Sequence, residues 1–511
     1  MLFNSYIFLF IFFPICLLGY YGLLHGQKPV AARVFLTAMS FWFYGYFNLS
    51  YLLIMVCSIG VNFLFHRLLS QEEAQDRENN RKRYGVSRRA VMIAAVAFNL
   101  GVLFYFKYFD FFLATVNGVF GASFALRGIL LPLGISFFTF QQISFVVDTY
   151  WGEVKNCPLD EYALFVSFFP QLIAGPIVNH SEMLPQFEKI GEKTPDWERI
   201  AGGFALFTMG LAKKVLLADT FGAGVDYGYE NMAALGRMDA VLVVFSYAFQ
   251  LYFDFSGYCD MAVGISRMLG IEIPENFCSP FKAVNIIDFW KRWHITLNRF
   301  FTKYVYIPLG GNRRGEGRMY LNFLIIFFLS GLWHGAGFHY IIWGMLQGVL
   351  YVATRFWQKR IKPAVSGGAE RLSGFGRKIV THVSQTAIFL YACFSWVYFR
   401  AEDVGQANRF LMTIFRGKVQ KLSMDLAECF QVDELWYVLK VLHLDHLSVS
   451  RYIPMFVILA AGLYFSMIGK NAAERTARFK YRADETAVIV VLMVWCVLSF
   501  SGVSTFLYFN F

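Results

Sequence analysis

Two histidines of this chain lie where a titratable side chain is out of place. His334 stands at the centre of FFLSGLWHGAGFHYIIW, residues 327–343, whose two arms are apolar enough for a lipid bilayer. His294 lies among aromatic and basic residues in the segment 285–315. An ionisable group inside a membrane is costly and is a functional candidate by default, and imidazole exchanges a proton near neutral pH. These positions indicate proton transfer at an embedded histidine; the alternative is a hydrogen-bonded core residue.

The glycines around His334 predict how the chain positions it. Gly331, Gly335 and Gly337 weaken a helix at this point. They interrupt an apolar stretch, residues 320–357, that has basic loops belonging to one membrane face on both sides. Two crossings need roughly 40 residues and a turn, so a hairpin fits whose tip stops within the membrane or near its far side. Irregular backbone at that depth must be covered by protein or line a cavity, so we expect His334 at a helix break beside an internal passage.

The segment around His294 is too basic for a simple span and too aromatic for a free cytoplasmic loop. Its sequence, NIIDFWKRWHITLNRFFTKYVYIPLGGNRRG, places Trp290 and Trp293 beside His294 among lysines and arginines. An embedded helix that lines a cytoplasmic entrance fits both properties. Its cations suit a phosphate-bearing ligand such as coenzyme A or a phosphopantetheine carrier. The alternative for most of the charges is basic side chains that reach from apolar surface to the membrane interface.

The whole chain has the composition of a polytopic helical membrane protein. Of its 511 residues, 57% are hydrophobic and only 16% are charged, and apolar runs long enough to cross a bilayer recur along its length. We therefore predict an all-α fold of about 11–13 membrane-embedded helices. The net charge of +11 collects in loops between the runs, which indicates topology signals and not nucleic-acid binding.

The basic loops give the predicted topology. Loops 67–89, 282–318, 355–378 and 470–482 are rich in lysine and arginine, and we place them on the cytoplasmic side. Both termini then lie outside, with an outer loop at residues 400–452. The clear spans are residues 6–24, 34–47, 49–65, 379–399, 455–468 and 487–507. The apolar segments in which we expect kinked or partly embedded helices are residues 128–147, 162–178, 204–218 and 240–269.

Several long motifs occur in an order that resembles a known family. They are LPLGISFFTFQQISFVVDTYWG (131–152), FFPQLIAGPIVNH (168–180), LYFDFSGYCDMAVG (251–264), DFWKRWHITLNRFFTKYVYIPLGGNR (288–313), SGLWHGAG (330–337) and FLYFNF (506–511). The chain resembles the membrane-bound O-acyltransferases (MBOAT), in the bacterial branch that includes the alginate O-acetylation membrane protein and the peptidoglycan O-acetyltransferases. The resemblance covers nearly the whole chain, so we expect one integral-membrane domain, residues 1–511, with its catalytic core at 128–357 and a last span and aromatic tail at 487–511.

The resemblance also implies a fold, a reaction and site residues. It implies a ring of tilted helices around a central tunnel, with the acyl donor entering from the cytoplasm and the acceptor outside. His334 would be catalytic and His294 the second active-site histidine. We expect no tightly bound cofactor and no metal; acyl-CoA, such as acetyl-CoA, or an acyl carrier thioester would be the co-substrate. His334 would then act as the base that takes a hydroxyl proton, while His294 would orient the donor or stabilise the thioester oxyanion.

The aromatic tail suggests an acyl relay. Tyr508 is the only hydroxyl in FLYFNF, and a phenol is a better leaving group than a sugar hydroxyl. We hypothesise that Tyr508 accepts the acyl group in the bacterial inner membrane and passes it outward. The expected partner is an extracytoplasmic esterase-like acyltransferase, and the expected acceptor is a polysaccharide or cell-wall polymer. The alternative for the tail is an aromatic belt at the membrane interface.

A different class of function stays open for the histidines. A transporter or flippase of polysaccharide precursors would use His334 and His294 as proton relays. Such proteins often have paired halves, and the sequence shows no internal repeat of this kind. Consumption of a thioester by the purified protein separates the two classes. The HLDH stretch, residues 443–446, is a weaker candidate for a metal site, because two histidines and one aspartate lack a distant further ligand.

Overall fold

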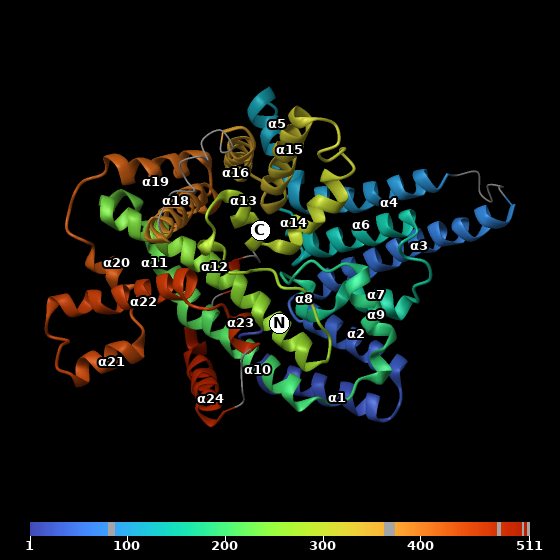
Figure 1. Cartoon of the computed structure of the whole chain (residues 1–511), viewed down its shortest axis with the longest axis horizontal. Helices are drawn as coiled ribbons and strands as arrows, with labels where there is room; N and C mark the ends of the chain where they lie inside the picture. Colours follow the sequence, from blue (N-terminus) through green and yellow to red (C-terminus); the bar gives the residue numbers. More distant parts are fainter. Residues whose placement is uncertain (80–86, 362–373, 478–481, 503–504, 508–511) are drawn as a thin grey trace. The chain divides into compact units, whose positions relative to one another are not determined.

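The computed structural model describes residues 1–79, 87–361, 374–477, 482–502 and 505–507, and within these ranges the chain forms helices and no strand (Figure 1). This confirms the predicted all-α fold. The chain divides into two compact units. The first unit contains residues 1–207 and 259–275, and the second contains residues 208–258 and 276–507. Each unit is described by itself below.

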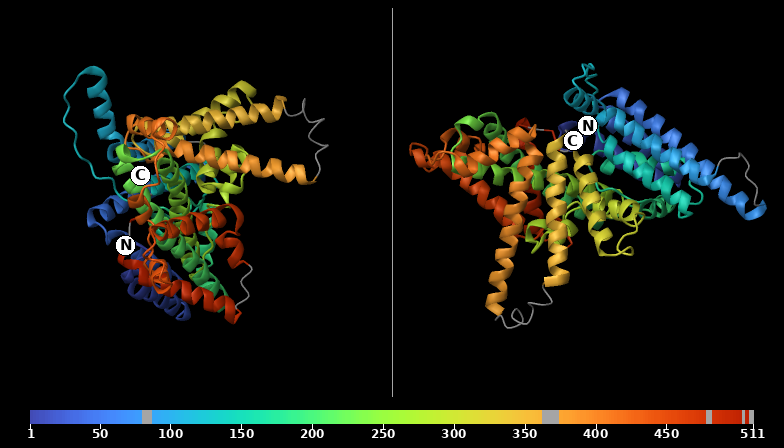
Figure 2. Two further views of the ribbon diagram at one scale, coloured as in Figure 1. Left: turned by 90° about the vertical axis from the view of Figure 1, so that its left-hand side faces the viewer. Right: turned by 90° about the horizontal axis from the view of Figure 1, so that it is seen from above.

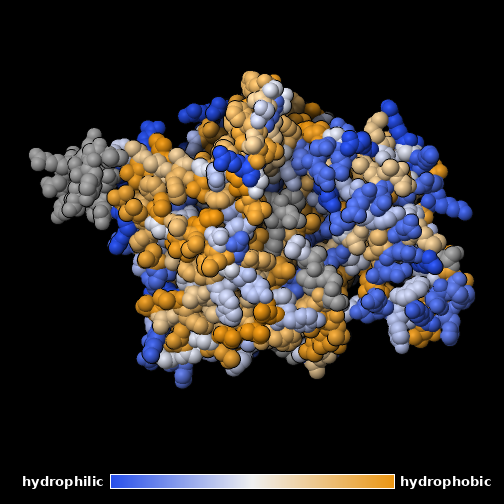
Figure 3. All heavy atoms as spheres, turned by 180° about the vertical axis from the view of Figure 1, so that it is seen from behind, coloured by the Kyte–Doolittle hydropathy of each residue, from blue (hydrophilic) through white to orange (hydrophobic). Residues whose placement is uncertain are grey.

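Six helices in the described ranges are long and apolar enough to cross a membrane by themselves. They are Phe8–His25, Leu49–Ser70, Arg88–Phe120, Trp197–Glu230, Arg237–Met268 and Val449–Ile468. Large hydrophobic side chains are exposed along them, such as Leu18 and Leu53, and hydrophobic residues cover broad areas of the face drawn in Figure 3. Exposed apolar surface of this extent fits contact with lipid and not with water. The protein is a multi-pass membrane protein.

The first unit packs its helices around an aromatic core. Its helices are α1 (Phe13–His25), α2 (Pro29–Gly45), α3 (Leu49–Asn79), α4 (Arg88–Leu103), α5 (Phe109–Phe120), α6 (Ile135–Trp151), α7 (Leu159–Ser167), α8 (Phe169–Leu172), α9 (His180–Glu188) and the start of α10 (Trp197–Ala212). The rings of Phe12, Phe43 and Phe169 are fully buried and lie 5.2–5.7 Å apart. Within residues 162–178, where we expected a kinked or partly embedded helix, α7 ends at Ser167 and the short α8 begins at Phe169.

The second unit carries the helices that hold both histidines. They are α11 (Asp219–Glu230), most of α12 (Arg237–Met268), α13 (Ile286–Arg292), α14 (Ile295–Phe301), α15 (Glu316–His334), α16 (Phe338–Phe356), α18 (Gly374–Arg400), α19 (Val404–Arg416), α20 (Met424–Glu428), α21 (Asp433–Val441), α22 (Ile453–Leu463), α23 (Ala472–Thr476) and α24 (Ala483–Leu498). α12 runs through the predicted apolar segment 240–269 as one helix, Arg237–Met268.

The α15–α16 hairpin confirms the break predicted around His334. α15 ends at His334 and α16 begins at Phe338. The two arms touch through their backbones, because a Cβ added at Gly331 would lie 2.4 Å from the Tyr340 carbonyl oxygen. Any side chain at that position would therefore push the arms apart. Figure 2 shows α18 beside α16, so the hairpin is supported by a third helix.

The segment 400–452, which we predicted to connect two spans on the outer side, contains α19, α20 and α21. The amphipathic α19 explains this, because Phe410 is buried and stacks on Tyr229 of α11, with the ring centroids 4.6 Å apart. The last α-helix, α24, ends at Leu498 within the predicted span 487–507, and a 3₁₀ turn, Ser499–Gly502, follows it.

Candidate functional site

His334 is the last residue of α15 and is held by its own helix. Its side chain is buried at 2% exposure, and its Nδ1 lies 2.6 Å from the carbonyl oxygen of Ser330. A carbonyl oxygen can only accept, so Nδ1 must carry the proton. The neutral ring therefore has its basic lone pair on Nε2, the nitrogen that a proton acceptor needs.

His294 lies in the turn between α13 and α14 and is held by a residue from elsewhere in the unit. Its backbone is left-handed, with φ 47° and ψ 52°, and its side chain is fully buried. Its Nδ1 lies 3.2 Å from Oδ1 of Asn276. The same oxygen accepts the Thr296 N–H at 3.1 Å, which identifies it as the amide oxygen, because an N–H cannot bond to the amide nitrogen as an acceptor. His294 is therefore also protonated on Nδ1.

The structure brings the two histidines together within the second unit. Their ring centroids lie 6.4 Å apart with the rings at 76° to each other. The Trp333 ring lies against both, at 5.9 Å from His294 and 4.9 Å from His334. Phe255 of α12 packs edge-on against His294 at 4.9 Å, and Trp343 packs against His334 at 5.0 Å. The result is a pair of imidazoles with defined tautomers inside an aromatic enclosure.

The segment predicted as one embedded helix is two short helices. α13 ends at Arg292 and α14 begins at Ile295, and the left-handed His294 forms the break. One of its cations is already engaged, because Arg292 Nε lies 2.9 Å from Oδ1 of Asp288 and Nη1 donates to the Cys278 carbonyl oxygen. Lys291 is exposed, so it stays a candidate for contact with a phosphate group.

Tyr508 lies outside the described residues, which include the three residues just before it, 505–507. Thr505, Phe506 and Leu507 follow α24 and its terminal turn, and Phe506 is buried at 1% exposure. The sequence predicts that these residues end the last span and begin the aromatic tail. The structure anchors them inside the second unit through Lys214 and Asp254.

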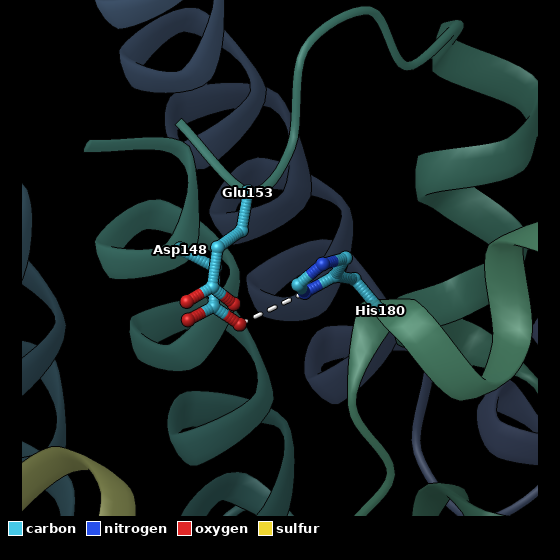
Figure 4. Close-up of side chains that lie close together, drawn as sticks. All are labelled: Asp148, Glu153 and His180. Atoms are coloured by element: carbon cyan, nitrogen blue, oxygen red, sulfur yellow. Dashed lines mark hydrogen bonds and ion pairs between the residues drawn. The ribbon is translucent and has the colours of Figure 1, made fainter. Parts of the chain in front are cut away.

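A third cluster, in the first unit, was not singled out from the sequence. Asp148 at the end of α6, Glu153 and His180 at the start of α9 have ligand-type atoms within 4.8 Å of one another (Figure 4). Nδ1 of His180 lies 2.8 Å from Oδ2 of Asp148. These donor types can bind a divalent cation, but Glu153 is exposed. The hydrogen bond between Asp148 and His180 by itself ties α6 to α9.

Three other histidines, His339, His443 and His446, lie apart from this arrangement. Nδ1 of His339, in the first turn of α16, lies 2.9 Å from the Tyr398 carbonyl oxygen of α18, which fits its omission from the predicted site. His443 and His446 follow α21 and are exposed. They therefore stay no more than the weak candidate that the sequence suggested.

The fold and this buried pair define a multi-pass helical membrane protein with two histidines at helix breaks. A model of the membrane-bound O-acyltransferase family, MBOAT, matches residues 152–394, which include both histidines. The chain is 35% identical to the peptidoglycan O-acetyltransferase of Helicobacter pylori over 100% of its own length and 98% of that protein. It is 33% identical to the "Probable alginate O-acetylase AlgI" of Pseudomonas putida over the full length of both chains.

A shorter match links the chain to a third relative. It is 31% identical to the teichoic acid D-alanyltransferase of Bacillus subtilis over 44% of this chain and 60% of that protein. The chain belongs to the membrane-bound O-acyltransferase family and is an O-acyltransferase. The resemblance read from the motifs is thereby confirmed.

Proposed function

We propose that this protein moves an acetyl group from a cytoplasmic thioester across the bacterial inner membrane to the hydroxyls of an extracytoplasmic polysaccharide or cell-wall polymer. The names of the relatives support acetyl as the group and a polymer as the acceptor. The donor is acetyl-CoA or an acyl carrier thioester, because a thioester is activated for transfer and the exposed Lys291 suits its phosphate groups. The carboxyl terminus lies on the outer side, where the group is delivered.

His334 is the general base in this proposal, and its hydrogen bond to Ser330 is the observation that carries it. With Nδ1 donating to the carbonyl oxygen, Nε2 is the nitrogen that accepts a proton. The attacking hydroxyl oxygen bonds to the thioester carbonyl carbon as its proton moves to Nε2. The carbon–sulfur bond then breaks, and the leaving thiolate takes the proton from the imidazolium. A positioned base of this kind contributes about 10²–10⁴-fold to the rate.

His294 fits a positioning role better than an oxyanion role. Its Nδ1 proton is committed to Asn276, so the neutral ring offers Nε2 only as an acceptor. To stabilise an oxyanion, Nε2 would have to donate a hydrogen bond, and the ring would then need a second proton. To accept a hydrogen bond from the attacking hydroxyl or from the acyl donor, the ring needs no additional proton.

Tyr508 is the first acceptor in this proposal and relays the group outward. Its hydroxyl attacks the thioester, the proton passes to His334, and an aryl ester forms. The serine hydroxyl of an esterase-like extracytoplasmic partner then displaces the phenolate, which regains a proton, and the partner acylates the polymer. The aryl ester keeps the group activated, because the phenol is more acidic than a sugar hydroxyl.

Thioester consumption by purified protein in vesicles tests the reaction. His334→Ala should lower release of free thiol from acetyl-CoA by about 10²-fold or more, since the base is lost. His382→Ala is the matched control, because His382 is an exposed histidine on the adjoining α18 and should leave the rate unchanged. Thiol release at the control rate by the His334→Ala protein would remove His334 from the chemistry.

Tyr508→Phe tests the relay apart from the base. The substitution keeps the aromatic ring and removes only the hydroxyl, so insertion in the membrane should be normal while acetyl-labelled protein disappears. The measurement is mass spectrometry of the carboxyl-terminal peptide after reaction with labelled acetyl-CoA. Intact transfer to polymer by the Tyr508→Phe protein would reduce the tail to an anchor.

A further inference from the structure

A buried ion pair in the second unit lies apart from the histidines. Lys214 belongs to the π-helical turn Lys213–Ala218 that follows α10, and Asp254 lies within α12. Their side chains are 1% and 2% exposed, and Nζ lies 2.8 Å from Oδ1. Asp219 Oδ1 accepts from the same Nζ at 2.7 Å. A buried ion pair contributes little to stability, because removing both charges from water costs free energy. A binding role is therefore a better explanation for this pair.

Both partners of the ion pair contact the backbone just before the carboxyl terminus. Nζ of Lys214 donates to the Thr505 carbonyl oxygen at 3.2 Å. Oδ2 of Asp254 accepts the Leu507 N–H at 3.0 Å. The Lys214 cation thus binds a backbone acceptor, and the Asp254 anion binds a backbone donor two residues further along the chain. This pairing is the one expected for charge-assisted hydrogen bonds.

The residue between these two contacts enters the second unit as an anchor. Phe506 is 1% exposed, and its ring meets Tyr258 edge-on with the centroids 4.9 Å apart. Nζ of Lys214 lies 4.8 Å from the centre of the same ring, within cation–π range. Three consecutive residues are therefore held by two main-chain hydrogen bonds and one buried side chain.

The tail segment supplies one of the acceptors that the lysine needs. An ammonium group has three donors, and those of Lys214 bond to Asp219, Asp254 and Thr505. Removing the tail would take one acceptor away from a buried cation and one donor away from a buried carboxylate. Both members of the ion pair therefore form part of their hydrogen bonding with the bound tail segment.

One turn of α12 connects this arrangement to the histidine pair. Asp254 and Tyr258 are four residues apart, so they lie on one face of the helix, and both hold the tail. The intervening Phe255 contacts the His294 ring at 4.9 Å. The same helical turn thus supports the tail on one side and a histidine on the other.

We propose that Lys214, Asp254 and Tyr258 form a socket that binds the chain's own carboxyl-terminal segment and so positions Tyr508 for acyl transfer. The inference rests on the proposed function for its consequence, but not for the binding itself. Lys214 and Asp254 are positioning residues: they act on the backbone of residues 505–507 and do not touch the reacting atoms.

Digestion of the full-length protein from its carboxyl end tests the socket without using activity. In the intact protein, a carboxypeptidase should stop trimming after Leu507, because the Leu507 N–H and the Phe506 ring are bound. In the Lys214→Met protein, trimming should pass Thr505 at least about tenfold faster, because a hydrogen bond to a charged group changes the equilibrium between bound and free tail by more than about tenfold. Phe506→Ala should have an effect in the same direction, because it removes the buried ring. Intact mass spectrometry reports the end point.

The control is the neighbouring lysine. Lys213→Met removes a cation that contacts Ser256 and Tyr252, so trimming should stop where it does in the unaltered protein. Phe506→Ala keeps the ion pair intact and guards against failure of the Lys214→Met protein to fold. Equal trimming of the unaltered, Phe506→Ala and Lys214→Met proteins would overturn the socket.

An acyl-transfer assay distinguishes failure of the proposed socket from failure of the proposed Tyr508 relay. Asp254→Asn and Tyr508→Phe should each abolish acetyl labelling of the tail, and the double variant should transfer to polymer no worse than Tyr508→Phe alone. If Asp254→Asn frees the tail to digestion while polymer transfer stays at the unaltered rate, the socket stands and the proposed relay fails.

Discussion

The turn that carries His294 and the hairpin that carries His334 fix their imidazoles by different means. His334 bonds to a carbonyl four residues back in its own helix, so its orientation is set wherever α15 forms. His294 depends on the side chain of Asn276, which is 18 positions away in sequence. The same tautomer is therefore fixed by a bond within one helix at His334 and by a tertiary contact at His294. The two histidines should therefore respond to different substitutions.

The largest expected effect comes from breaking the hairpin. Gly331→Val adds a side chain whose Cβ would clash with the Tyr340 carbonyl oxygen of the facing arm, so the arms must separate. We expect loss of the folded membrane protein, or a fall in its thermal unfolding temperature with activity abolished. Gel filtration in detergent and a thermal melt measure this. Normal melting of Gly331→Val would show that the arms do not touch at this point.

An intermediate effect is expected at Asn276. Asn276→Ala removes the acceptor of His294 Nδ1, of the Thr296 N–H and of the Thr296 hydroxyl. Each stranded buried group costs about 1–3 kcal/mol, and the His294 ring loses its fixed tautomer. We expect the rate of acyl transfer to fall at least about tenfold, which corresponds to a loss of 1.4 kcal/mol or more.

Asn276→Asp sharpens the same comparison. The carboxylate keeps an oxygen for His294 and Thr296, so activity should recover above that of Asn276→Ala. The measurement is the initial rate of thiol release, with apparent donor KM and kcat separated. If both substitutions change only stability and leave both kinetic constants intact, Asn276 supports the fold and does not position His294.

The smallest effect is expected at Ser330. Ser330→Ala removes a hydroxyl but leaves the carbonyl oxygen that accepts from His334 Nδ1, so the rate should stay within about twofold, as expected when no tertiary bond is lost. The assay is the same thiol release. A loss comparable with that of Asn276→Ala would mean that the serine hydroxyl takes part and that the bond within the helix alone does not fix His334.

The local features of the site were predictable and the tertiary ones were not. The break after His334 follows from glycines within an apolar stretch, and the structure confirms it. The 6.4 Å approach of His294 to His334 was expected only through the family resemblance. The left-handed turn at His294 and its bond to Asn276 depend on packing between segments, which residue spacing does not encode.

The tail socket was missed although a sequence signal existed. Lys214 and Asp254 each lie inside an apolar segment, where a charged side chain is a functional candidate. The apolar runs around them predict kinked or partly embedded helices, a prediction that gives the two charges no role. Their pairing with each other and with residues 505–507 became visible only from the folded chain.

The left-handed backbone at His294 has a consequence for how this protein can change. A φ of 47° costs an ordinary residue about 1–2 kcal/mol, whereas glycine adopts it readily. On backbone energy alone, glycine would be the preferred occupant of this turn. Keeping a histidine at this position therefore lowers the stability of the folded chain in exchange for activity. Laboratory selection for heat resistance, without selection for catalysis, should tend to replace His294 with glycine or asparagine.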